Sequence, residues 1–228
     1  MKPEIEKPAK FPFIVPEFVL NSELPKLNLW QITVKAIAKS HWWYLCLIIV
    51  GSLSSIIYPH VPLVGLAAVA GNTLTRNKAL ISAMSIWFAN QLYGFTIRQY
   101  PRTLESLIWG LVMGLGILLV TWLITLPTKF SRHSFQGYLL WLAISVIGGY
   151  AMYQGSIVLI NQLMGGHGFS STILWQIFLK DVAWAVVLSA IHSSFVWLVI
   201  QTIPTYSHPS FPPTYYSGYH PPGCGRKG

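Results

Sequence analysis

Charged residues, and acidic ones above all, are scarce in this sequence. Only 9% of the 228 residues are charged, whereas 53% are hydrophobic; a typical soluble domain is about one quarter charged. Such a chain has too few polar groups to cover a surface that faces water. The composition therefore argues against a soluble globular protein and favours one that is solvated by a lipid bilayer.

Cysteines and recognisable catalytic groups are also few. Cys46 lies in an apolar run and Cys224 lies near the end of the sequence, which does not suit a disulfide framework. We find no carboxylates paired in register, no serine or cysteine beside an obvious base, and no histidine cluster with metal-ligand spacing. The sequence therefore predicts no catalytic site, no metal site and no cofactor, and we expect a protein that is not an enzyme.

We also expect no cleavable signal peptide, because the first 40 residues contain prolines and charges instead of a short apolar core. We divide the chain into an arm at residues 1–40, a helical bundle at 41–203, and a tail rich in proline, tyrosine and glycine at 204–228. Residues 27–40 predict a short helix, either lying on the membrane surface or extending the first span.

What the sequence does have is a series of long apolar runs. They predict an all-α, polytopic membrane bundle whose main spans are residues 42–58, 79–95, 104–126, 135–164 and 182–203. Residues 61–72 form a shorter run rich in glycine and alanine. As a helix it would reach only about 18 to 22 Å, against a hydrocarbon core of roughly 30 Å. It could be a short span in a thinned bilayer, a broken helix or a re-entrant loop.

The positions of the cations favour six spans with both ends in the cytoplasm. In that arrangement every lysine and arginine except Arg98, Arg102 and Lys180 lies on the cytoplasmic side, as the positive-inside rule requires. The net charge of +9 comes from cations in short loops between apolar runs. We therefore expect anionic membrane lipids as partners, and no nucleic acid.

Polar residues near the predicted outer face are candidates for binding a small ligand. Arg98 and Arg102 could bind an anionic group through forked hydrogen bonds, although lipid phosphates would serve them equally. The candidate ligand-binding residues are Asn90, Gln91, Arg98, Arg102, Gln154 and Asn161. Gln154 and Asn161 are seven apart and share a helix face, where hydrogen bonds between helices are the alternative. Glu105 is expected to pair with Arg98 or Arg102.

Small residues four apart predict close helix packing. The two pairs are Gly51 with Ser55 and Gly110 with Gly114.

The last apolar stretch is too long for one span. At about 50 Å as a helix, it should divide into an interfacial piece at 171–180 and a span at 182–203, with Lys180 and Asp181 near the boundary. We interpret His192, deep in this span, as a hydrogen-bonded core histidine.

The layout of residues 58–122 resembles a known family. Five features occur in this order: a proline after the first span, the small-residue segment PLVGLAAVAG, a cationic turn, a span ending near GF, and YP ahead of a span containing WG. This layout is similar to that of the small six-span substrate-binding subunits of energy-coupling-factor transporters. The resemblance implies capture of a vitamin or metal on the outer face, together with a transmembrane coupling subunit and paired ATPases.

Two functional hypotheses follow. In the first, the chain is a substrate-capture subunit for a small micronutrient, and the small-residue faces of the first and fourth spans contact its partner. In the second, it is a non-catalytic scaffold or assembly subunit that holds a larger membrane complex through its two tails.

Overall fold

The fold is a bundle of helices, seen in a computed structural model that describes residues 29–58, 60–126, 134–163 and 170–202. Within these residues the helices are α1 (Leu29–Lys39), α2 (His41–Ile57), α3 (Leu63–Thr73), α4 (Arg76–Thr96), α5 (Leu104–Ile124), α6 (Phe135–Leu163) and α7 (Ser171–Thr202). The predicted all-α class is confirmed for the described chain. The tail at 204–228 and most of the arm lie outside it.

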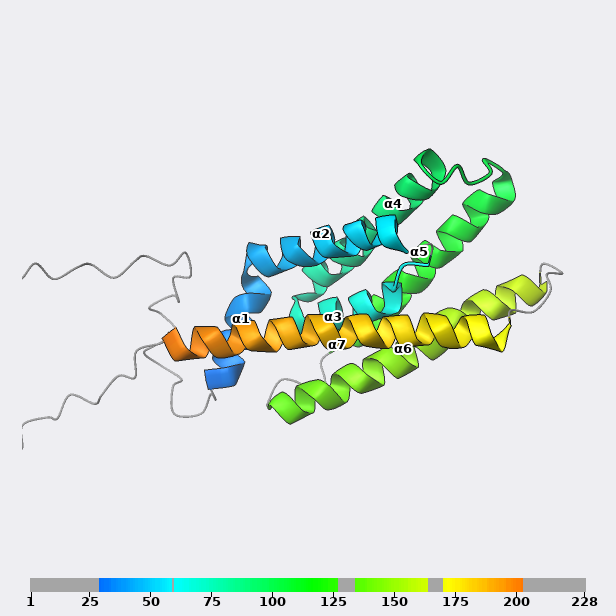
Figure 1. Cartoon of the computed structure of the whole chain (residues 1–228). Helices are drawn as coiled ribbons and strands as arrows, with labels where there is room; N and C mark the ends of the chain where they lie inside the picture. Colours follow the sequence, from blue (N-terminus) through cyan, green and yellow to red (C-terminus); the bar gives the residue numbers. More distant parts are fainter. Residues whose placement is uncertain (1–28, 59, 127–133, 164–169, 203–228) are drawn as a thin grey trace, which may run out of the picture.

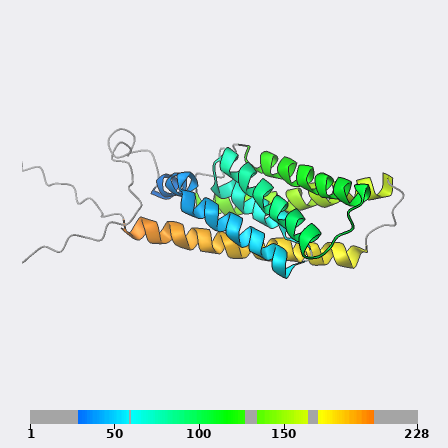
Figure 2. The ribbon, with the colours of Figure 1, turned by 90° about the horizontal axis from the view of Figure 1, so that it is seen from above.

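The short helix α3 lies at the centre of the bundle. Helices α2, α4, α5, α6 and α7 all pack against it (Figures 1 and 2), and every residue from Leu63 to Gly71 is buried. The glycines and alanines of this run allow the surrounding backbones to come close. Residues 61–72, for which the sequence left three alternatives open, therefore contribute one unbroken helix that is enclosed by protein.

The outer helices present apolar side chains outwards. α5, α6 and α7 are each long and apolar enough to cross a membrane, and the bent pair α1 and α2 would add a fourth candidate if it is one span. At most a third of the most apolar stretch of each long helix is buried, and side chains such as Leu104, Ile147 and Trp197 are exposed. Water would disfavour so much exposed apolar surface. The chain is an integral membrane protein.

Successive helices from α2 to α7 alternate in direction, as the colours in Figure 1 show. The C-terminal ends of α2, α4 and α6 lie at one end of the bundle, and those of α3 and α5 lie at the other. α1 and the last turns of α7 share this second end, and the two helices pack together.

α1 is a separate helix that meets α2 at an angle of 65°. Ser40 stands at the bend and accepts a hydrogen bond from the Trp43 backbone N–H at 3.5 Å. The Lys78 ammonium donates to the backbone oxygens of Lys39 and Ser40 at 2.5 and 2.9 Å, so it caps the last carbonyls of α1. α1 is therefore not a straight extension of α2.

α7 corrects the prediction for the last apolar stretch. It is one continuous helix of 32 residues, and the expected division between residues 180 and 182 is wrong. The two charged side chains at that point are accommodated separately. Asp181 turns inwards to α3, and Lys180 lies over the ring of Tyr58, so the helix continues through them.

Candidate functional site

The N-terminus of α3 is capped by a side chain from another helix. α3 starts after Pro62, which makes no side-chain cap, and the Gly65 N–H donates to the Asp181 carboxylate at 2.8 Å. The Val64 N–H also donates towards this carboxylate. The first N–H groups of a helix have no partners within the helix and carry partial positive charge. Asp181, only 2% exposed, satisfies two of them inside the bundle.

Gly65 is required by this close approach of α3 and α7. A Cβ atom at this position would collide with the backbone carbonyl oxygen of Asp181, and a backbone atom cannot move aside as a flexible side chain can. The glycine therefore sets the distance at which the Asp181 carboxylate reaches the helix end.

The other end of α3 reaches a buried aromatic cluster. The Trp43 indole N–H donates to the Thr73 hydroxyl oxygen at 2.9 Å, and this hydroxyl donates to the Val69 carbonyl at 2.7 Å. The His192 ring centroid lies 5.2 Å from that of Trp43 and 5.9 Å from that of Tyr138. Helices α2, α3, α6 and α7 all contribute to this cluster.

His192 is completely buried, at 0% exposure. Neither ring nitrogen has a hydrogen-bond partner among the residues that the structure describes. The interpretation of His192 as a hydrogen-bonded core histidine is therefore wrong for the described chain. The ring is held by its aromatic neighbours instead.

Asp181 and His192 lie at opposite ends of α3. They are eleven residues apart on α7, which is about 16 Å along a helix, and α3 is itself 11 residues long. The two buried ionisable groups of α7 therefore bracket the enclosed helix. We call this arrangement, Asp181 with α3 and His192, the central axis.

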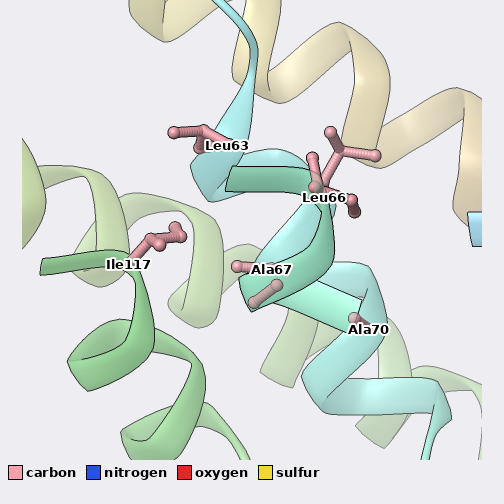
Figure 3. Close-up of a pocket in the computed structure, with 7 residues that line it drawn as sticks. Leu63, Leu66, Ala67, Ala70 and Ile117 are labelled. Carbon is pink, nitrogen blue, oxygen red and sulfur yellow. The ribbon is translucent and has the colours of Figure 1, made fainter. Parts of the chain in front are cut away.

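A small apolar crevice lies beside the central axis, as Figure 3 shows. It runs between α3, α4 and α5, is too narrow for a water molecule, and is lined by Leu63, Leu66, Ala67, Ala70, Ala83, Ile86 and Ile117. It offers no polar group to a ligand.

The candidate ligand-binding residues fall on separate parts of the bundle. Asn90 and Gln91 lie on α4, whereas Gln154 and Asn161 lie on α6. α4 and α6 do not pack along each other, since each instead packs on α3 and α5. Gln154 is buried, and the Gln91 amide lies against Gly110. The fold thus places the two amide pairs on either side of α5 rather than next to each other.

The two candidate arginines differ in their surroundings. The Arg98 guanidinium donates to the Ser55 carbonyl at 2.9 Å and lies 5.4 Å from the centre of the Tyr93 ring. Arg102 is exposed in the connection to α5. Glu105 is exposed too, and no ion pair in the described part of the chain joins it to either arginine, so the expected pairing is wrong.

The small-residue pairs lie at contacts with α4. A Cβ at Gly51 would meet the Ile86 side chain at 2.5 Å, and one at Gly114 would meet the Trp87 ring at 2.6 Å. Ser55 is buried on the same face of α2 as Gly51. These faces are therefore occupied by a helix of the same chain.

Metal-binding groups do not gather in the described residues, where no three His, Cys, Asp or Glu side chains lie together.

Sequence reasoning missed the capping of α3 by Asp181 and the aromatic setting of His192. One signal was present for the first: Pro62 precedes the small-residue run with no Ser, Thr, Asp or Asn immediately before it, so the cap had to come from elsewhere.

Comparisons with protein-family models, with curated proteins and with solved structures gave no match.

Proposed function

We propose that this chain is the membrane-embedded subunit of a transporter that captures a small micronutrient. In this proposal helices α2 to α7 provide six crossings, and both chain ends lie in the cytoplasm. The alternating helix directions in Figure 1 support it, as do the cations Lys35, Lys39, Arg76 and Lys78 at the end of the bundle that holds α1. This charge placement agrees with the positive-inside rule.

The observation that carries the proposal is the enclosed helix α3 with its N-terminus on the buried Asp181 carboxylate. α3 is shorter than the hydrocarbon core, but protein encloses it, so the backbone groups at its ends need not face lipid. Transporters use such short or broken helices at the middle of the membrane, where helix ends meet charged groups. An ionisable side chain inside a membrane bundle is costly, and it commonly marks a solute or ion pathway.

Partners follow from the resemblance to substrate-binding subunits of energy-coupling-factor transporters. We propose a transmembrane coupling subunit and paired ATPases. Because Gly51 and Gly114 already pack against α4, the coupling subunit would contact the outward faces of the bundle.

The test is mass spectrometry of proteins and small molecules that co-purify with the full chain from native membranes in mild detergent. The proposal expects a stoichiometric vitamin or metal together with ATPase subunits. A large complex without ATPases and without a bound solute would overturn it and would favour the scaffold function. In that case, deletion of residues 204–228 should release the complex and leave the bundle folded.

A further inference from the structure

Three basic side chains from three different segments of the chain lie near the last turn of α2. Arg98, just after α4, donates to the Ser55 carbonyl at 2.9 Å. Lys180, from α7, has its ammonium nitrogen 5.7 Å from the centre of the Tyr58 ring. His60 follows Tyr58 by two residues in the connection to α3. We call these three residues the basic cluster.

No acidic side chain neutralises the basic cluster within the described residues. Those residues contain two acids, Glu105 and Asp181. Glu105 is exposed and unpaired there, and Asp181 is engaged by the amides of α3. Partial burial, followed by the charges of Lys180 and then Arg98, holds the pKa of His60 below its ordinary value of 6.5. The electrostatic environment at this point thus disfavours another positive charge.

Stabilisation of α2 explains only part of this arrangement. Cations are favourable near a helix C-terminus, and Arg98 serves that purpose at the Ser55 carbonyl. Lys180 lies instead over an aromatic ring, and its three N–H donors point to no carboxylate in the described chain. A guanidinium has five N–H donors in a planar fork, and the Ser55 carbonyl engages one nitrogen of Arg98.

The remaining donors suit an oxygen anion. A carboxylate or phosphate accepts forked hydrogen bonds from an arginine and a further bond from a lysine. Arg98 and Lys180 are both half-buried, which strengthens such contacts relative to fully exposed ones.

We propose that Arg98, Lys180 and His60 form a binding site for an oxyanion group, a carboxylate or a phosphate, at the end of the bundle where α2 ends. The assignment of this group to a captured solute rests on the proposed function. The same chemistry can be supplied by a lipid head group, so the two sources must be separated by experiment.

The test follows the pKa of His60 by NMR in the full chain with labelled histidine, using H60Q to identify its signal. Inorganic sulfate is added in a maltoside detergent, with chloride at equal ionic strength as the reference. Bound sulfate should raise the pKa of His60, because a nearby negative charge favours the protonated ring. The pKa of His60 is also measured in vesicles with and without phosphatidylglycerol, which tests whether a lipid head group binds at the site.

Variants locate the response. K180M should weaken sulfate binding about tenfold, which corresponds to one charge-assisted hydrogen bond. R98K keeps the charge and a single bond to Ser55 but loses the fork, so it should weaken binding without unfolding α2. K35M removes one lysine from the exposed face of α1 at the other end and should bind sulfate like the parent.

A rise in the His60 pKa with sulfate supports a site open to soluble anions, and a rise only with phosphatidylglycerol supports an oxyanion site filled by lipid. No rise in either sample, or a rise that K180M and R98K leave unchanged, would overturn the proposal. A micronutrient that still co-purifies in that case would leave the proposed function standing. If sulfate raises the pKa of His60 but no transport partner co-purifies, the oxyanion site is supported and the proposed transporter function is overturned.

Discussion

At the scale of single residues, Asp181 has two roles that substitutions can separate. Its carboxylate accepts hydrogen bonds from α3 amides, and it is also the one acidic group buried in the described bundle. A buried N–H that loses its partner costs about 1 to 3 kcal/mol. The cap needs only an oxygen acceptor, whereas a role in solute or ion transport needs a group that can ionise.

We therefore expect D181N to lower the free energy of unfolding by less than about 1 kcal/mol, because its carbonyl oxygen can still accept from Gly65. D181L has a similar size but no acceptor, and it should cost about 2 to 6 kcal/mol for two unpaired amides. Thermal unfolding in detergent measures both. Equal losses in the two variants would show that charge, not capping, stabilises α3.

For His192 we expect substitution to preserve or raise the stability of the protein. Because neither ring nitrogen has a partner in the described chain, the imidazole contributes buried polar atoms without compensating hydrogen bonds. H192F keeps a flat ring between Trp43 and Tyr138 and removes that penalty. It should unfold at the same or a higher temperature, with a gain of up to about 2 kcal/mol. A clear loss of stability would mean that the ring nitrogens are satisfied in the membrane.

At the scale of the helices, the close approach of α3 and α7 depends on one glycine. G65A should lower the free energy of unfolding by more than about 2 kcal/mol, because its Cβ would strike the Asp181 backbone oxygen and force the helices apart. Gly148 of α6 has no atom within 4 Å of the position of an added Cβ. G148A is therefore the matched control, and it should be neutral or stabilising by up to about 1 kcal/mol. Similar melting temperatures for both variants would argue against the tight contact.

The helices themselves were largely predictable, since each long apolar run became a helix within a few residues of its expected bounds. α7 was not, because the length argument treated Lys180 and Asp181 as residues that had to leave the bilayer. In the structure each charged side chain contacts another part of the bundle: Asp181 contacts α3, and Lys180 contacts Tyr58. Such contacts depend on the register between helices that are distant in sequence, which no hydropathy pattern contains.

The same reason limits prediction of the site. Gln91 and Gln154 were recognisable as polar residues in apolar runs, but nothing in the sequence shows that α5 separates their helices. Nothing in the sequence shows that His60 and Lys180 lie near Arg98. Their common neighbour is the last turn of α2, and only the packing of α4 and α7 onto it brings them together.

At the scale of the whole molecule, the proposed topology makes a direct prediction. With both ends cytoplasmic, a cysteine introduced by N77C, in the first turn of α4, and one introduced by R102C, before α5, lie on opposite sides of the membrane. In a C46A/C224A background, which removes both native cysteines, a thiol reagent that cannot cross the bilayer should label R102C in intact cells and N77C only after lysis. Labelling of both from outside would contradict six crossings. Both positions are exposed, so access to the thiol is not limited by burial.

The capping of α3 by α7 also affects the order in which the protein is made. Gly65 and Asp181 are 116 residues apart, so at 5 to 20 residues per second the ribosome needs roughly 6 to 23 seconds to synthesise the cap after the helix it serves. During that interval the N–H groups of Val64 and Gly65 must bond to water or to the insertion machinery, since bare lipid offers no acceptor. A chain that stalls before α7 would leave these amides uncapped, and it should be recognised as unfinished and degraded.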